Sequence, residues 1–287
     1  MNISEKLTYY LLRFMSWKTH LFPRYLTIKF GRFLGYIIWL FFSIRKEVAF
    51  NNISIAFPDK SEKVRKEILK KTYLHFGVVL MDFLRMPYMT EKQINELVVL
   101  DEDSIRLLNK HKKGVIVTAH FGNWEFLQPM VSFQGFPFGV VAQRQKNKGA
   151  NKYFTWAREK TGIEIIYKRE PVRKMLSALK IGFLALASDQ YGGKYGAKIK
   201  FFGKPTRMPK GAASFNLKIG SPILNGYCIL SNDYSYKLSL KEVIIDNKID
   251  EKNSVEYICQ LLSDMLENEV VKHPEQYFWF HRKWRIK

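Results

Sequence analysis

The sequence predicts an α/β fold with a mostly parallel central sheet flanked by helices. From residue 114 onward, short apolar runs rich in β-branched side chains alternate with segments of helical periodicity, and Gly or Pro stands at many of the borders. Two of the runs, 113–120 and 183–190, stay apolar until they end in polar residues, which is typical of strands covered on both faces. We therefore expect one α/β domain over residues 51–287, preceded by a helical membrane-associating segment over residues 1–50.

The expected elements can be placed in chain order. Residues 1–50 are apolar and basic and are expected to be helical. Pro58 then interrupts the chain, and Ser61 is a suitable N-cap, because its hydroxyl can accept a hydrogen bond from a free amide of the first turn. The apolar face of the long helix that follows is expected to be Val64, Ile68, Tyr73, Phe76 and Leu80. Strands are predicted at 113–120, 136–144, 163–168, 183–190, 221–230 and, nearer an edge, 234–245. Helices are predicted at 151–162, 171–182, 211–220 and 254–276.

The composition narrows the classes of function. The chain has 47 basic and 26 acidic residues, a net charge of +21, with the cations scattered along it. Such a protein attracts an anionic partner: nucleic acid, a membrane surface, an acidic protein or a phosphorylated substrate. Cys228 and Cys259 are too few for a disulfide framework or a Cys-rich metal site, and they indicate a reducing, cytosolic setting. The chain has no phosphate-binding loop, no G-x-S-x-G motif and no histidine cluster in sequence, so no metal site is expected.

The N-terminal part contains the run "FLGYIIWLFFSI", residues 33–44, with Lys29 and Arg32 before it and Arg45 and Lys46 after it. A bilayer needs about 20 apolar residues for a helical span, so this run is short for a crossing. A helix that lies in the membrane interface, with the cations on anionic headgroups, fits better. The alternative is an ordinary buried core helix. No cleavable signal is expected in the first 20 residues.

The stretch "VTAHFGNWE", residues 117–125, joins a predicted strand to a predicted helix. His120 closes the strand, Gly122 permits a sharp turn, and Asn123 is a suitable N-cap. Glu125 then falls in the first helical turn, where it can meet His120. A carboxylate beside an imidazole fixes its tautomer and favours its protonated form, which prepares a histidine as a general base. A buried histidine at the start of a helix is the alternative.

Other polar residues follow neighbouring strands. Asp189 and Gln190 end the run at 183–190, and Gln143 and Arg144 end the run at 136–144. In open α/β sheets, reactive groups gather beyond the carboxyl ends of the strands. We therefore expect these residues to lie at the same edge of the sheet as His120.

Five stretches in order resemble the lipid A late acyltransferase family, over nearly the whole chain: "NNISIAFPDKSEKVRKEI", "HFGNWE", "VAQRQKNKGANKYFTWARE", "ASDQYGGKYGAKIKFFGKPTRMPKGAASFNLKIGSPIL" and "HPEQYFWFHRKWR". The second is similar to the His-x4-acid motif of glycerolipid acyltransferases. The resemblance implies a glycerolipid-acyltransferase-like sheet and transfer of a fatty acyl chain from an acyl-carrier-protein thioester to a hydroxyl of a lipid A precursor. His120 would be the general base and Glu125 its partner, with no cofactor.

The same resemblance implies roles for further residues. Arg158 and Asp189 match positions that are important in the family: Arg158 would face the oxyanion or a phosphate, and Asp189 would orient an arginine. A surface arginine and a helix cap at a strand end are the respective alternatives. Arg144, with Gln190 and Asn123, would contribute to substrate binding. In "WFHRKWR", either the segment contacts headgroups, or its aromatics and Tyr277 pack on the core while Arg282 and Arg285 reach solvent.

The implied partners are an acidic acyl carrier protein, a membrane lipid acceptor and the membrane surface, at the cytoplasmic face of the inner membrane. Two rival functions remain. The same fold could acylate another glycolipid, an aminolipid or a pigment, with acyl-CoA or acyl carrier protein as donor. A non-enzymatic nucleic-acid-binding protein is disfavoured, because the cations are interleaved with apolar segments and no nucleic-acid motif is present.

Overall fold

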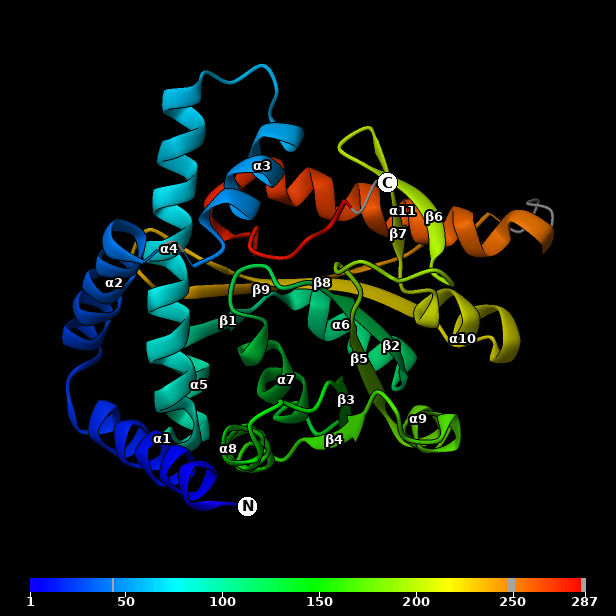
Figure 1. Cartoon of the computed structure of the whole chain (residues 1–287). Coiled ribbons are helices and arrows are strands. Elements are labelled where there is room, and N and C mark those ends of the chain that lie inside the picture. Colours follow the sequence, from blue (N-terminus) through cyan, green and yellow to red (C-terminus); the bar gives the residue numbers. More distant parts are fainter. Residues whose placement is uncertain (43, 247–250, 285–287) are drawn as a thin grey trace.

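The computed structural model describes residues 1–42, 44–246 and 251–284, and it is built on a seven-stranded sheet (Figure 1). The strand order is β1-β9-β8-β2-β5-β3-β4, and every neighbouring pair is parallel except β8 and β9. The mostly parallel sheet expected from the sequence is confirmed. The strands are β1 (Val98–Leu100), β2 (Gly114–Thr118), β3 (Phe138–Ala142), β4 (Glu164–Tyr167), β5 (Phe183–Ala187), β8 (Ile223–Leu230) and β9 (Tyr236–Glu242).

Both faces of the sheet are buried because successive side chains of each strand point in opposite directions. In β2, Ile116 belongs to one apolar cluster, whereas Val115 and Val117 belong to the other. The Ile116 cluster includes residues of α5 (Glu91–Leu97), α6 (Glu102–His111), α7 (Trp124–Ser132) and α8 (Lys148–Glu159). The opposite cluster includes α9 (Val172–Ile181), α10 (Gly211–Ile219) and α11 (Glu251–Lys272). The predicted layers of helix, sheet and helix are thus present.

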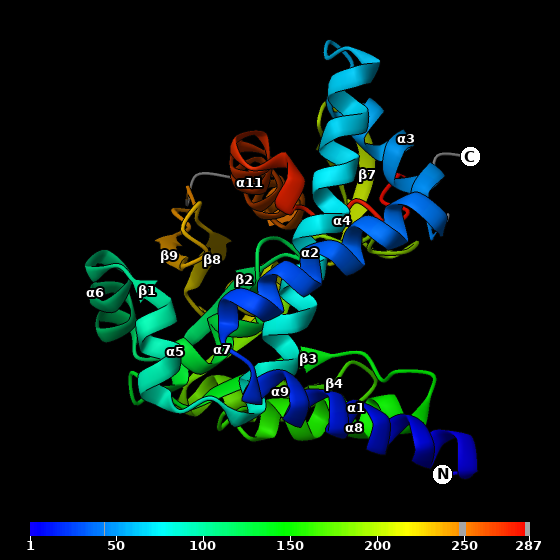
Figure 2. The same cartoon turned by 90° about the vertical axis from the view of Figure 1, so that its left-hand side faces the viewer.

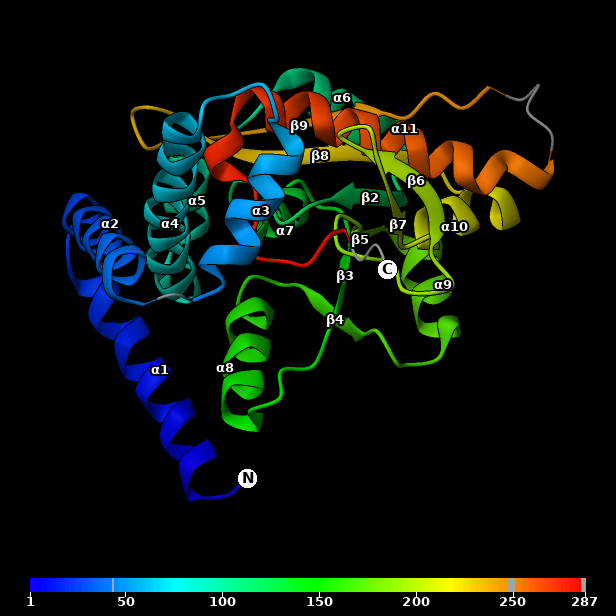
Figure 3. The same cartoon turned by 45° about the horizontal axis from the view of Figure 1, so that its top comes forward.

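The N-terminal part consists of α1 (Ile3–Leu21), α2 (Arg24–Phe41) and α3 (Lys46–Ala56), followed by the long α4 (Glu62–Arg85). Figures 2 and 3 show α1 beside α8 and α2 beside α4. The α2–α4 contact is made by main chain, since a Cβ on Gly77 would lie 2.0 Å from the carbonyl oxygen of Gly31. Ser61 is the N-cap of α4, as expected. The α3 helix crosses residue 50, the boundary expected between the two parts of the chain.

Large apolar side chains are exposed along α1 and α2 and at the residues that flank them. Among the described residues, no single helix has the length and apolarity to cross a membrane; only α2 and α3 taken together pass that test, with a bend of 97° between them. Within the run 33–44, Gly35 is buried, whereas Phe33, Phe41 and Phe42 are exposed, so the run is not a fully enclosed core helix. Ser43 lies outside the described residues. The exposed residues of α1 and α2 are Ile3, Leu7, Tyr10, Leu11, Phe14, Trp17, Leu21, Tyr25, Leu26, Phe30, Phe33, Tyr36, Leu40 and Phe41.

Several elements were not expected from the sequence. They include β1, α5, α6, two short 3-10 helices (Met86–Tyr88 and Pro274–Gln276) and an antiparallel hairpin of β6 (Ala197–Phe201) and β7 (Lys204–Met208). The prediction of the apolar face of α4 is confirmed only in part, because Ile68 and Tyr73 are buried but Val64 and Leu80 are exposed. The hairpin is important for the site described below, because Phe201 and Thr206 contact the C-terminal end of the described chain.

Candidate active site

His120 lies in the connection between β2 and α7, at the carboxyl edge of the sheet. Gly122 has a φ of +61°, and a Cβ at this position would lie 2.0 Å from the carbonyl oxygen of Cys228. Only glycine fits this turn, as the sequence predicted. Asn123 occupies the N-cap position of α7, but its side chain makes no capping bond. It is fully buried, and its amide donates to the hydroxyl of Tyr236 at 3.3 Å.

The imidazole of His120 is paired with Asp189. The Nδ1 of His120 lies 2.9 Å from Oδ1 of Asp189, and Nε2 of Gln190 lies 3.4 Å from the same Nδ1. The strand register explains this contact: Thr118 of β2 pairs with Ala187 of β5, so the residues two positions further on also stand side by side. The expected convergence of His120, Asp189 and Gln190 at one edge is confirmed. With its Nδ1–H donating to Asp189, a neutral imidazole presents Nε2 as an acceptor.

Glu125 faces a different partner. The Nε and Nη2 atoms of Arg158 donate to its two carboxylate oxygens at 2.9 and 2.7 Å, and the indole of Trp124 donates to it at 3.0 Å. The sequence suggested that His120 bonds to Glu125; in the structure, Nδ1 of His120 bonds to Asp189 instead. Likewise, Asp189 orients a histidine rather than an arginine. The first turn of α7 directs Glu125 toward α8, which carries Arg158.

The charges around His120 favour its protonated form. Burial of the imidazole lowers its pKa, but the carboxylates of Asp189 and Glu125 outweigh burial and hold the pKa of His120 above its ordinary value. Burial raises the pKa of Asp189, but His120 and Lys283 outweigh it, and the pKa of the carboxyl is lowered. The His120 side chain is 25% exposed, whereas that of Asp189 is 2% exposed. Solvent therefore reaches the imidazole and not the carboxylate that holds it.

Arg144 follows β3 at the same edge of the sheet, but its side chain contacts other residues than His120 does. Its guanidinium stacks 3.7 Å above the ring of Tyr167 and lies 3.7 Å from a carboxylate oxygen of Glu170. Its side chain is 62% exposed. Within the described residues, Arg144 makes no hydrogen bond or ion pair with His120. It is an exposed cation near the site, open to a ligand from solvent.

Residues 277–284, which we call the C-terminal segment, were not singled out for the site by the sequence. The main-chain N–H of Phe278 donates to the carbonyl of His120 at 2.9 Å. The ammonium of Lys283, a residue that is 3% exposed, donates to the carbonyl of Asp189. Tyr277 and Trp279 are buried, so core packing is confirmed for these aromatics. Arg285 lies outside the described residues. A lysine in a row of C-terminal cations gave no signal of burial.

An apolar cavity of about 410 Å³ opens beside the site, between α2, α4 and the C-terminal segment. Phe278 and Phe76 form part of its wall. The ring of Phe278 is centred 6.0 Å from the imidazole of His120. The ring of Trp124 is centred 6.1 Å from that of Phe76 and 4.8 Å from the imidazole. The imidazole of His120 thus lies beside a wall residue of an apolar space of the size of a ligand pocket.

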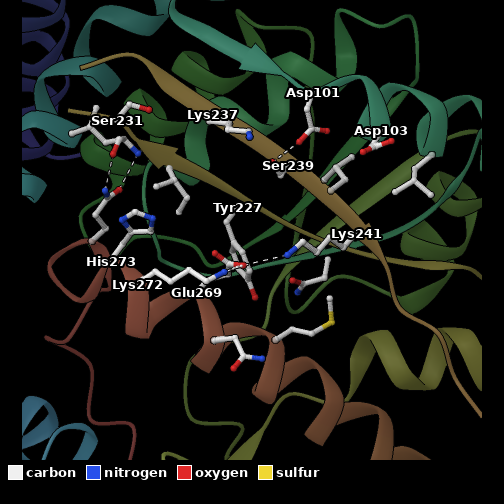
Figure 4. A pocket seen from close by; sticks show the side chains of 18 of the residues that line it. Asp101, Asp103, Tyr227, Ser231, Lys237, Ser239, Lys241, Glu269, Lys272 and His273 are labelled. Atoms are coloured by element: carbon white, nitrogen blue, oxygen red, sulfur yellow. Dashed lines mark hydrogen bonds and ion pairs between the residues drawn. The ribbon is translucent and has the colours of Figure 1, made fainter. Parts of the chain in front are cut away.

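A larger groove of about 1460 Å³ lies between α6, β8, β9 and α11, and Figure 4 shows its polar lining. None of the residues predicted for the site lines it. Its charges are largely paired with one another, as in the cluster of Lys241, Glu269 and Lys272. The groove therefore has no excess charge of one sign. Among the described residues, no group of His, Cys, Asp or Glu could hold a metal ion.

A histidine held by a buried carboxylate at a strand end, beside an apolar cavity, is an arrangement that suits general-base chemistry on an apolar substrate. The model of the bacterial lipid A biosynthesis acyltransferase family matches residues 2–286. The chain belongs to this family of acyltransferases.

The names of the relatives refer to different lipids. It is 22% identical to the lipid A biosynthesis palmitoleoyltransferase of Escherichia coli K12, over 90% of this chain and 84% of the relative. It is 21% identical to the lipid A biosynthesis lauroyltransferase of the same organism, over 94% and 89% of the two chains. It is also 22% identical to the phosphatidylinositol mannoside acyltransferase of Mycolicibacterium smegmatis, over 77% and 73%.

Proposed function

We propose that the protein transfers a fatty acyl chain from an acyl-carrier-protein thioester to a hydroxyl of a lipid A precursor, with His120 as the general base. The observation that carries the proposal is the imidazole geometry: Nδ1 is held by the buried Asp189, and the described residues make no hydrogen bond to Nε2. The family match and the lipid A acyltransferases among the relatives support the reaction class.

In the proposed reaction, Nε2 of His120 removes the proton from the acceptor hydroxyl while the oxygen attacks the thioester carbonyl. The C–S bond then breaks, and the imidazolium returns its proton to the leaving thiolate. Asp189 keeps the proton on Nδ1 and stabilises the cation that forms. The carboxylates that raise the pKa of His120 therefore act in the direction the reaction requires.

Glu125 is proposed as a second electrostatic partner of His120 and as the residue that fixes Arg158. Its charge raises the pKa of the imidazole without a direct hydrogen bond. The guanidinium of Arg158 is largely enclosed, with 15% of the side chain exposed, and is held in a bidentate pair. A cation fixed in this way is suited to stabilise the oxyanion that develops on the thioester carbonyl.

The apolar cavity beside Phe278 is proposed as the site of the acyl chain. Most of its wall is apolar, with Leu34, Ile38 and Leu80 beside aromatic rings, which suits a hydrocarbon chain; Arg45 and His281 also line it. Because the cavity adjoins the imidazole through Trp124 and Phe278, a chain lying in it would place its carboxyl end near His120. Arg144 and Gln190 are proposed for the polar end of the substrates.

The exposed apolar face of α1 and α2 is proposed to rest on the cytoplasmic face of the inner membrane. It is an extended set of aromatic and aliphatic side chains, which marks an interaction surface in a protein. The net charge of +21 would attract both anionic lipid and an acidic carrier protein. No cofactor is required by the proposed reaction.

A second candidate keeps the chemistry and changes the acceptor to a phosphorylated glycolipid other than lipid A. The resemblance to a phosphatidylinositol mannoside acyltransferase favours it, and acyl-CoA could replace the carrier protein as donor.

Mass spectrometry of lipids from a strain that lacks the protein separates the two candidates. We expect lipid A to lose the mass of one acyl chain, and the wild-type protein, but not His120→Ala, to restore it. An unchanged lipid A together with the loss of another acylated glycolipid would favour the second candidate. No lipid change at all would contradict both.

A further inference from the structure

The C-terminal segment contacts the main chain of both members of the His120–Asp189 pair. The N–H of Phe278 donates to the carbonyl of His120 at 2.9 Å, and the ammonium of Lys283 donates to the carbonyl of Asp189. One step before the segment, the carbonyl of Gln276 accepts from the N–H of Gly122 at 3.0 Å. The two residues of the pair come from different strands, and the same short segment bridges both strand ends.

The segment itself is fixed from several sides. The amide of Asn52 in α3, which is buried, donates to the carbonyls of Trp279 and His281 at 2.7 and 2.6 Å. Thr206 of the β6–β7 hairpin donates to the carbonyl of Lys283 at 2.7 Å. These bonds hold the main chain of the segment at several points, so no single one of them fixes the position of Lys283.

Burying the charged ammonium of Lys283 costs free energy. The residue is 3% exposed, and the ring of Phe201 lies 4.7 Å from the nitrogen. The charged groups facing it are Asp189 from the end of β5 and Glu267 from α11. Burial lowers the pKa of Lys283 to about 8, against the partial compensation from these two carboxylates. Replacing a whole buried ion pair by apolar residues often costs little stability, whereas removing only one partner leaves the other charge buried and uncompensated. The cation of Lys283 therefore matters for the buried carboxylate of Asp189.

We infer that Lys283 is a positioning residue, which fixes the main chain and the charge of Asp189 so that this carboxylate holds His120 in the reactive orientation. The inference rests on the proposed function of the pair. A cation near Asp189 favours the ionised form of the buried carboxylate, and the hydrogen bond from Lys283 holds the main-chain carbonyl of Asp189 in place. Since Lys283 touches no reacting atom, it acts only through Asp189.

The test compares Lys283→Met with Lys283→Arg and with the control Thr206→Val. Methionine removes the cation and retains the stem, arginine retains a cation, and valine at position 206 removes a bond to the same segment while leaving the ammonium in place. We expect Lys283→Met to lower kcat by about 10²-fold, the scale of a displacement of about 1 Å in an active site, with KM within about 2-fold. Lys283→Arg should recover most of kcat, and Thr206→Val should keep it within about 3-fold of the wild type.

A spectroscopic measurement reports on the same contact without substrate. The Nδ1–H of His120, identified by ¹⁵N-histidine labelling and by its loss in His120→Ala, should give a protected resonance in the wild type, in Lys283→Arg and in Thr206→Val. In Lys283→Met it should be lost to exchange. A protected resonance and unchanged kcat in Lys283→Met would overturn the inference, and so would equal losses in Lys283→Met and Thr206→Val.

A different result would show that the proposed function itself is wrong. If His120→Ala transferred acyl chains as fast as the wild type, the reaction assigned to the site would be wrong, and the resonance would still decide whether Lys283 holds the pair.

Stability against pH gives an independent check that Lys283 is buried as a cation. The unfolded chain binds a proton at Lys283 up to its ordinary pKa of 10.5, whereas the folded chain releases it at about 8. The free energy of unfolding should therefore rise with pH between these values. Lys283→Met should lack this contribution; an identical rise in both proteins would mean that Lys283 is not buried as a cation.

Discussion

At the scale of the residue, the geometry of the site is set by two pairs, each of one carboxylate and one basic side chain. Asp189 contacts His120, and Glu125 contacts Arg158. Both carboxylates raise the pKa of the imidazole, but only Asp189 bonds to it. The two acids therefore contribute differently: Asp189 through geometry and charge, Glu125 toward His120 through charge alone.

The first prediction concerns the base itself. His120→Ala should lower acyl transfer by about 10²- to 10⁴-fold or more, because a general base contributes an acceleration of this size. The variant should remain folded, since the imidazole is partly exposed and its loss opens little space. Turnover of the purified variant, with circular dichroism as the control of folding, checks the prediction. Near-normal turnover would remove His120 from the mechanism.

The second prediction concerns the pH dependence at Glu125. Glu125→Gln removes a negative charge that raises the pKa of His120, so the pKa should fall. Where titration of His120 limits kcat/KM, the acid limb of the pH–rate profile should move to lower pH, and the plateau should fall. If Glu125 itself were the base, no such shift could occur, because the variant would lack the titrating group.

At the scale of the element, the contact of α2 with α4 sets the shape of the apolar cavity. Gly31 and Gly77 bring the two main chains together, and Gly35 and Gly77 both line the cavity. A side chain at these positions must push the helices apart, which would alter both the packing and the space proposed for the acyl chain.

The third prediction follows from that contact. Gly77→Ala should destabilise the protein by about 1–3 kcal/mol, as overpacking of a close contact does, because the new Cβ would lie 2.0 Å from the carbonyl oxygen of Gly31. Gly211→Ala is the matched control, since its nearest contact would be the end of the Leu186 side chain at 3.4 Å. Thermal unfolding of the two variants gives the answer, and equal midpoints would argue against the close helix contact.

The sequence predicted the helices and strands better than it predicted the contacts within the site. A run of β-branched residues marked β2, an apolar run marked β5, and the glycine of "HFGNWE" marked the turn after His120, because these signals are local. The pairing of His120 with Asp189 depends on β2 and β5 being neighbours in the sheet, which no local pattern states. Glu125 was the nearest acid in sequence and was therefore the first candidate. Lys283 was missed for the same reason, since its burial follows from distant elements.

At the scale of the whole molecule, the exposed apolar face of α1 and α2 lies on the N-terminal helices that pack against the enzyme body. In Figure 1 these two helices form one side of the molecule. Because α2 also lines the apolar cavity, the proposed membrane surface and the proposed acyl site share one helix. On this proposal, a lipid substrate would reach the site from the same surface that is proposed to rest on the membrane.

The fourth prediction tests this face. Replacing Phe30 and Phe33 together by Gln should reduce binding to vesicles that contain anionic lipid, because both side chains are more than half exposed and flanked by cations. Replacing Val172 and Ile181 of α9 by Gln is the control, since these residues are equally exposed on another element. Vesicle co-sedimentation of the folded variants should separate them. Equal binding would place the membrane surface elsewhere.

The pH–rate profile of Asp189→Asn, measured beside that of Glu125→Gln on one acyl donor, tests most directly the claim that Asp189 holds the catalytic imidazole. Asparagine keeps the size of the side chain but loses the charge and no longer fixes the proton on Nδ1. The account predicts that Asp189→Asn lowers the plateau more than Glu125→Gln and moves the acid limb further to lower pH, because Asp189 raises the pKa of His120 more than Glu125 does. A plateau and an acid limb close to those of the wild type in Asp189→Asn, with the full loss in Glu125→Gln, would contradict it.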